Sequence, residues 1–200
     1  MQHGRLEWPR PDELTPDSKA VYDAIAGGPR ASAAKVFQMA DEDGRLEGPF
    51  NAMLTAPALG MPLQELGASI RYRTSFADRA RDIPILAVAA HHVCDYEWYA
   101  HEALGAKCGL SSDELADLKA GRSAASFSPS EAVIHATTYA LITQRALTDA
   151  ESAAAVAALG IEAVTELTIL VGYYECLQLL MGAWQPPLPA GVIDPFVGVA

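Results

Sequence analysis

Three side chains with chemical potential fall one helical turn apart near the middle of the sequence. Cys94, Glu97 and His101 lie in the stretch CDYEWYAH. On a helix this spacing puts all three on one face, so the carboxylate and the imidazole can contact each other. A carboxylate beside a histidine holds the ring in one tautomer and stabilises its protonated form. His101 is therefore a candidate general acid or base, with Glu97 as its partner.

The residues around these three predict one long central helix over residues 82–108. Starting at Ile83, alternating steps of four and three residues trace a narrow stripe with apolar ends and Cys94, Glu97 and His101 in its middle. Such a stripe normally packs into a core, where a carboxylate and an imidazole are costly to bury without partners. The polar middle therefore indicates either a functional site or a structural Glu–His pair, which residue types alone do not distinguish.

Other residues flank this stripe. At about 100° per residue, Trp98 lies about 40° and His91 about 60° from Cys94, so both are candidates to line a pocket and bind substrate. Pro84 suits the first turn of a helix and Asp82 suits an N-cap. On a straight helix Asp82 lies about 120° from Cys94, so it reaches the site only if the helix breaks or another segment brings it in.

The segment CDYEWYAHEALGAKCGLS resembles the signature region of the carboxymuconolactone decarboxylase family, which includes the alkylhydroperoxidase D (AhpD) proteins. The peroxidase branch has an upstream Glu, then Cys-x-x-Cys, then a His four residues after the second Cys. His101 matches the His, Cys94 the first Cys and Asp82 the upstream Glu, whereas Glu97 replaces the second Cys. The YEW-x-x-H form is similar to the decarboxylase-like branch. GPFNAMLTAPALG and LTILVGYYECLQLLMGAWQPPLP resemble that branch too, so the resemblance spans residues 45–189.

The resemblance implies an all-α, AhpD-like helical domain that assembles as a homo-oligomer, either a trimer or a hexamer. It also implies removal of CO2, without a cofactor, from a small carboxylated or lactone-type substrate. In that reaction the electrons of the leaving carboxylate pass into a conjugated system and a proton arrives on carbon. We assign proton delivery to His101 and its orientation to Glu97, with Trp98 and the apolar stripe excluding water.

Three alternatives stay open. The first is an AhpD-like thiol peroxidase that uses Cys94. Without Cys-x-x-Cys, and with the Glu97 carboxylate raising the pKa of the thiol, we expect that activity to be weak or absent, and Cys94 otherwise to be a small buried apolar residue. The second is a non-catalytic, oligomeric ligand-binding protein. The third is a metal site, for which His91, Glu97 and His101 form an incomplete ligand set, so no metal or other cofactor is expected.

Composition narrows the remaining possibilities. The 200 residues suffice for a single domain with its own core, expected over residues 1–200. Half of the residues are hydrophobic and Ala is very common, which favours helices, and no alternating strand pattern is visible. The net charge of −11 argues against nucleic acid or an anionic membrane as a partner. Three cysteines without disulfide or zinc spacing, and no apolar leader at the N-terminus, predict a cytoplasmic location.

Helix-capping residues and helix-breaking prolines predict the order of the elements. Residues 1–16 carry three prolines and predict an extended arm, and residues 185–200 predict an irregular tail. Capping boxes begin helices after Ser111, Ser128 and Thr148, each with Glu three residues later. Further helices are expected over residues 17–26, 62–73 and 162–182, the last as a buried core helix. A short turn is expected over residues 31–39, a loop over 41–51, and at most one helical turn over 57–60.

Overall fold

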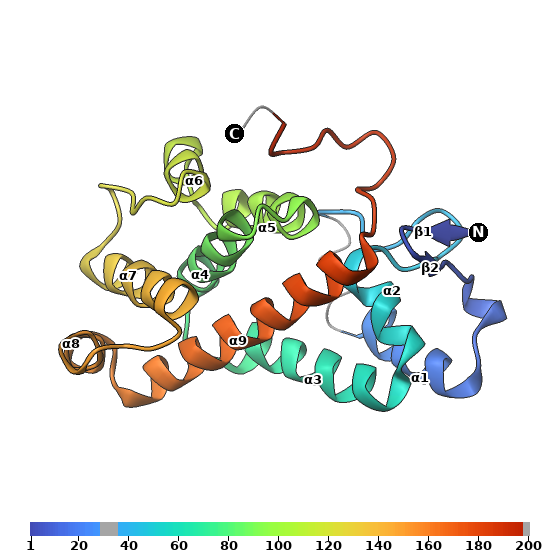
Figure 1. Ribbon diagram of the computed structural model, residues 1–200, viewed down its shortest axis with the longest axis horizontal. Helices are drawn as coiled ribbons and strands as arrows, with labels where there is room; N and C mark the ends of the chain where they lie inside the picture. Colours follow the sequence, from blue (N-terminus) through green and yellow to red (C-terminus); the bar gives the residue numbers. More distant parts are fainter. Residues whose placement is uncertain (29–35, 198–200) are drawn as a thin grey trace.

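Helices make up nearly all of the regular structure, which confirms the predicted all-α class (Figure 1). The computed structural model describes residues 1–28 and 36–197, so most of the turn expected over residues 31–39 lies outside the described residues. The described helices are α1 (Pro16–Ala26), α2 (Gly48–Thr55), α3 (Pro57–Arg73), α4 (Asp78–His91), α5 (Asp95–Lys107), α6 (Ser112–Lys119), α7 (Pro129–Gln144), α8 (Asp149–Leu159) and α9 (Ile161–Trp184).

The long helix α9 runs across the molecule and holds its two halves together. Helices α1, α2 and α3 lie on one side of it, and α4 to α7 lie on the other (Figure 1). Leu167, Leu170 and Leu177 of α9 are buried in the core, as predicted for this segment. By length and composition alone α9 could cross a membrane, yet 44% of its most apolar window is buried inside the fold.

The predicted single helix over residues 82–108 is wrong, because two helices occupy that stretch. Helix α4 begins at Asp78 and ends at His91, and α5 begins at Asp95. Pro84 therefore lies inside a helix instead of in its first turn, and the N-cap of α4 is Ala77, not Asp82. Helix α5 then packs back against α4 (Figure 1).

The turn between the two helices contains a strained residue, at which the chain reverses its direction. Val93 has a φ of 52°, in the left-handed region that a β-branched residue seldom adopts. The backbone N–H of Cys94 donates to the carbonyl of Ala89 at 2.9 Å, which closes the end of α4. No glycine or proline stands at His92, Val93 or Cys94, so the usual signals of a helix end are missing.

The segment before α4 is more helical than predicted. Residues 48–55 form α2 instead of ending a loop, and α3 begins at Pro57 instead of residue 62. Pro49 stands in the first turn of α2, where its missing N–H costs nothing. Gly48 has a φ of 55°, and a Cβ there would lie 2.2 Å from Cε1 of Tyr96. Only glycine fits where α5 approaches the start of α2 so closely.

The N-terminal arm is tied down at several points. It contains a hairpin of two short strands, β1 (Gln2–His3) and β2 (Leu6–Glu7), where the sequence predicts none. Nε2 of buried His3 lies 3.2 Å from Oε2 of Glu47, just before α2. The N–H of Arg5 donates to the carbonyl of Trp184 at the end of α9, at 2.8 Å. The arm therefore bridges the start of α2 and the end of α9.

The three predicted capping boxes are confirmed at the starts of α6, α7 and α8. Two of their glutamates also bind Arg79 of α4. The guanidinium makes two hydrogen bonds to Glu114, at 2.7 and 3.0 Å, and one to Glu131 at 2.7 Å. Glu114 also accepts from the Ser126 hydroxyl at 2.7 Å. This network joins the start of α4 to α6 and α7.

Glu114→Gln should lower the free energy of unfolding by about 3 kcal/mol, because it leaves a half-buried guanidinium short of a charged partner. The hydrogen bonds from Arg79 lower the pKa of Glu114 from 4.5 to about 2. A lowered carboxyl pKa stabilises the fold above pH 4.5, and that stabilisation is lost as the pH falls towards 2. Urea unfolding at pH 7 and at pH 3 measures both effects. Asp113→Asn, an exposed neighbour, should change stability by less than about 0.5 kcal/mol; equal losses in the two variants would contradict the assignment.

Candidate active site

A buried hydrogen bond between α4 and α5 organises the polar residues of the core. Nδ1 of His101 lies 3.0 Å from Oδ1 of Asp82, and both side chains are almost fully buried. The two residues come together because the turn at Val93 lays α5 back along α4. Asp82, which the sequence linked to the site only if the helix breaks, is therefore the nearest acidic partner of His101.

The other ring nitrogen of His101 faces two further groups. Its Nε2 lies 3.5 Å from Oε2 of Glu97 and 3.4 Å from the hydroxyl of Tyr174 on α9. Burial raises the pKa of Glu97, and the nearby His101 partly opposes that rise. Burial also raises the pKa of Tyr174 well above its ordinary value. These shifts favour the protonated forms of both groups, which are proton donors to a neutral imidazole nitrogen.

A small hollow lies beside the imidazole of His101. Its volume is about 50 Å³, and Arg71, Glu97, His101 and Tyr174 provide its polar wall. The rest of the lining is largely apolar and includes Phe37, Met39, Phe50, Leu104, Tyr173 and Leu177. We call this hollow the inner cavity. It has room for about one or two water molecules, so a larger ligand must displace some of these side chains.

The groups on the two ring nitrogens of His101 have different roles. By our assignment, the Asp82 carboxylate accepts a hydrogen bond from Nδ1 of His101. It therefore holds the neutral ring in the tautomer that carries its proton on Nδ1. The lone pair of Nε2 then points towards Glu97 and Tyr174 on the cavity side. A proton can pass between Nε2, Glu97 and a molecule in the cavity without leaving an apolar enclosure. This arrangement suits general acid–base chemistry.

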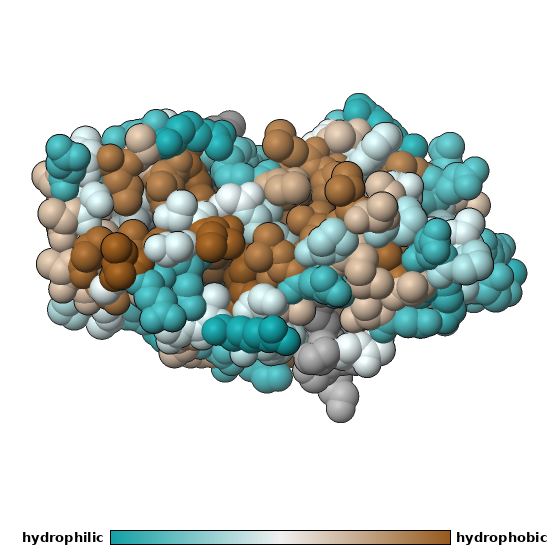
Figure 2. All heavy atoms as spheres, turned by 90° about the horizontal axis from the view of Figure 1, so that it is seen from below, coloured by the Kyte–Doolittle hydropathy of each residue, from teal (hydrophilic) through white to brown (hydrophobic). Residues whose placement is uncertain are grey.

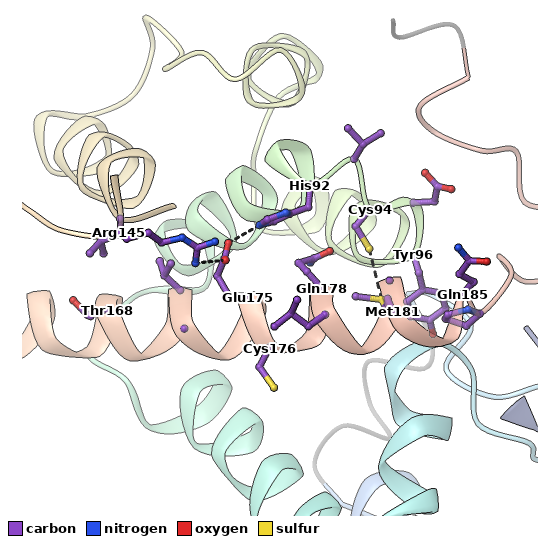
Figure 3. A pocket seen from close by; sticks show the side chains of 18 residues that line it. His92, Cys94, Tyr96, Arg145, Thr168, Glu175, Cys176, Gln178, Met181 and Gln185 are labelled. Atoms are coloured by element: carbon purple, nitrogen blue, oxygen red, sulfur yellow. Dashed lines mark hydrogen bonds and ion pairs between the residues drawn. The ribbon is translucent and has the colours of Figure 1, made fainter. Parts of the chain in front are cut away.

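Cys94 does not line the inner cavity, and Figure 3 shows its surroundings. Its thiol lies 3.6 Å from the sulfur of Met181 and lines a different hollow of about 970 Å³, between α9 and the α4–α5 turn. We call this hollow the α9 groove. Burial and the Glu97 carboxylate raise the pKa of the Cys94 thiol to about 12. The direction that the sequence predicts is thus confirmed, with burial as the larger cause.

The two residues predicted to bind substrate also lie apart from the inner cavity. Trp98 is fully buried, and its ring packs edge-on against Phe196 of the tail, with 5.6 Å between ring centroids. His91 is exposed at the end of α4, with its ring beside those of His92 and Tyr139. Of the candidates, the structure brings Asp82, Glu97 and His101 together and leaves Cys94, Trp98 and His91 outside.

Sequence reasoning missed two polar residues of the cavity. Arg71 lies in the last turn of α3, with Nη1 3.7 Å from Oδ1 of Asp82, and Tyr174 lies in a helix interpreted only as core. A tyrosine in a buried apolar helix needs a partner for its hydroxyl, and this was the available signal for Tyr174. No comparable signal distinguishes Arg71 from a surface arginine. Within residues 1–28 and 36–197, no group of three or more His, Cys, Asp or Glu side chains is arranged to hold a metal ion.

The fold is shared with solved structures that are distant in sequence. No protein-family model matches the chain, and no curated protein is significantly similar to it. An uncharacterized peroxidase-related protein from Ralstonia eutropha JMP134, with an alkylhydroperoxidase AhpD core, superposes with a TM-score of 0.74 at 11% identity, over 95% of this chain and 94% of that one. A variant of the debrominase Bmp8 in complex with 2,3,4-tribromopyrrole gives 0.69 at 13% identity, over 95% and 92%.

A peroxidase-related protein from Silicibacter sp. TM1040 also gives a TM-score of 0.69, at 10% identity over 95% of this chain and 94% of that one. Likenesses at such low identity define the fold alone. The chain therefore has an AhpD-like helical fold, as its sequence motif predicts.

Alkylation rates should separate the cysteines. With a pKa of about 12, Cys94 is a thiolate in only about one molecule in 10,000 at pH 8, and Met181 covers its sulfur. Iodoacetamide at pH 8 should therefore label exposed Cys176 and leave Cys94 unmodified over the same time. Peptide mass spectrometry of the folded protein measures both, with urea-unfolded protein as the control in which both react. Labelling of Cys94 as fast as Cys176 would contradict the raised pKa.

Proposed function

We propose that this protein is a cofactor-independent, decarboxylase- or lyase-like enzyme that acts on a small carboxylated or lactone-type molecule by general acid–base chemistry. The observation that carries the proposal is the buried Asp82–His101–Glu97 group, of which His101 and Glu97 line the inner cavity. The AhpD-like fold and the resemblance of the signature region to the decarboxylase-like branch support it.

The proposed step is a proton transfer coupled to loss of CO2. The bond between carbon and the substrate carboxylate breaks, its electron pair moves into the conjugated system, and the same system takes a proton on carbon. Nε2 of protonated His101 gives that proton, while Asp82 holds the ring through Nδ1 and stabilises its charge. Burial raises the pKa of Glu97 and so favours its protonated form, which returns a proton to the imidazole. The apolar lining favours loss of charge from the carboxylate.

The first alternative, a thiol peroxidase that uses Cys94, has less support. A reactive cysteine needs an accessible thiolate, whereas this thiol has a pKa of about 12 and contacts Met181. It also lines the α9 groove instead of the cavity that holds His101. The observation that supports this alternative is the fold that the chain shares with peroxidase-related proteins.

His101→Gln should reduce turnover by about 100- to 10,000-fold, the usual contribution of a general acid or base. The assay is CO2 release or loss of ultraviolet absorbance from a panel of small conjugated carboxylic and lactone acids. Glu102→Gln, one residue along on α5 and on another face of the helix, is the matched control and should leave turnover unchanged. Full turnover by folded His101→Gln on a substrate that the wild type consumes would refute the mechanism.

We also propose that the chain assembles as a homo-oligomer, a trimer or hexamer, in the cytoplasm, and that it binds neither nucleic acid nor membranes. Copies would meet through α9, where Ile161, Ile169 and Leu179 are 74, 47 and 76% exposed. Hydrophobic residues gather in patches on the face of the molecule that Figure 2 shows. A Cβ added to Gly172 would meet nothing within 4 Å, so a second helix can approach closely between the exposed residues. A second copy of α9 offers a matching apolar face.

The oligomer is measured by light scattering coupled to gel filtration. The wild type should run as an oligomer at micromolar concentration, and Leu179→Glu should shift it to smaller species, because the charge would be buried in the contact. Ile193→Glu, equally exposed but in the tail, is the control and should leave the mass unchanged. A monomeric wild type would contradict assembly. It would also exclude the alternative of a non-catalytic, oligomeric ligand-binding protein.

A further inference from the structure

Arg71 stands in the wall between two hollows. One is the inner cavity of about 50 Å³ beside His101. The other is an open hollow of about 620 Å³ on the surface, which we call the outer groove, where the end of α3 meets the start of α4 and the end of α5. Arg71 and Leu104 line both. A molecule that moves from the outer groove to His101 therefore passes the guanidinium.

Among the described residues, four cations line the outer groove, and two of them are hydrogen-bonded to carboxylates. Arg79 is held by Glu114 and Glu131. Nη2 of Arg81 lies 2.7 Å from Oδ1 of Asp78, the one acidic residue among the described residues of the lining. The other two cations are Arg71, whose ion pair with Asp82 is longer at 3.7 Å, and Lys107.

Both remaining cations have capacity to bind an anion. Lys107 is exposed and forms no ion pair with any residue in the part of the chain that the structure describes. Arg71 approaches Asp82 at 3.7 Å, which is beyond hydrogen-bond distance. The Arg71 side chain is 17% exposed, and within the described part of the chain none of its five N–H groups donates a hydrogen bond to another residue.

The charge inside the site makes a cation necessary for any anionic ligand. Asp82 is fully buried and carries a carboxylate, and Glu97 adds a second carboxyl group on the cavity wall. A ligand carboxylate that enters this enclosure needs a compensating positive charge, since unpaired buried charges are costly. Arg71 is the one arginine or lysine that the described residues contribute to the cavity wall, and its planar fork matches a carboxylate with two parallel hydrogen bonds.

We propose that Arg71 binds the carboxylate of the substrate, and that this anion reaches the inner cavity from the outer groove, past Lys107. The inference rests on the proposed function only in placing the rest of the substrate beside His101. Binding of the carboxylate itself requires no turnover. Arg71 thereby selects small organic acids over their neutral analogues.

The test measures binding of defined probes without catalysis. Benzoate and furan-2-carboxylate are titrated into the full-length protein, and the imidazole nitrogen signals of His101 are followed by two-dimensional NMR. The His101 signals are assigned by their absence in His101→Gln. Benzamide and furan-2-carboxamide are neutral probes of the same shape. We expect both carboxylates to shift the His101 signals and both amides to shift them at least tenfold more weakly at equal concentration.

Variants then locate the binding group. Arg71→Gln should weaken binding of the carboxylates at least tenfold and leave the weak amide response unchanged. Arg73→Gln removes an exposed arginine from the same end of α3 and is the matched control, with unchanged affinity. Arg71→Lys keeps the charge near Asp82 but loses the fork, so it should lie between wild type and Arg71→Gln. Lys107→Gln should weaken binding twofold to threefold at low salt and less at high salt, because it acts through screened attraction.

Several outcomes would overturn the inference. Wild-type affinity for carboxylates in Arg71→Gln would do so, as would equal responses to acids and amides. Failure of both carboxylates to bind the wild type would also do so. If Arg71→Gln does not fold, Arg71→Lys decides the matter, since wild-type binding there refutes recognition by the fork. These results are separate from the turnover of His101→Gln, so either proposal can fail while the other stands.

Discussion

The hydrogen bond from His101 to Asp82 is the contact on which the candidate site depends. The two residues are 19 positions apart in sequence. In a single straight helix they would be separated by about 28 Å, whereas their side-chain atoms lie 3.0 Å apart. The contact exists because the chain reverses at Val93, in a backbone conformation that costs energy by itself. The buried packing of α5 on α4 must offset that cost, so the core and the site support each other.

Stability alone gives no reason for the polar group at this position. Asp82, Glu97 and His101 are all nearly or fully buried, and Tyr174 beside them is buried too. Apolar side chains of similar volume are often as stabilising as a buried ionic group, or more so. Each member here lowers the cost of burying the others, because opposite charges and hydrogen bonds replace water. The cluster therefore fits a role in chemistry better than a role in holding the fold.

Much of the fold was predictable from the sequence because its signals are local. The capping boxes at Ser111, Ser128 and Thr148 each place a helix start within the chain, and all three are present. The break at Val93 was not predictable, since no glycine, proline or cap marks it. That one error misplaced Asp82, which a straight helix turns away from His101. Arg71 and Tyr174 were missed for a related reason, because only the folded chain brings three separate helices to one cavity.

The turn between α4 and α5 also restricts the number of residues that can separate Asp82 from His101. Exposed turns usually accept extra residues, and Val93 is 56% exposed. Here one inserted residue that joins the start of α5 would change the phase of that helix by about 100° and carry His101 off Asp82. The insertion would leave every side chain of the site in the sequence and dismantle the site nonetheless. The interval of 19 positions between the acid and the histidine is thus part of the site's signature. Distant relatives that keep both residues but change this interval would not be expected to share its chemistry.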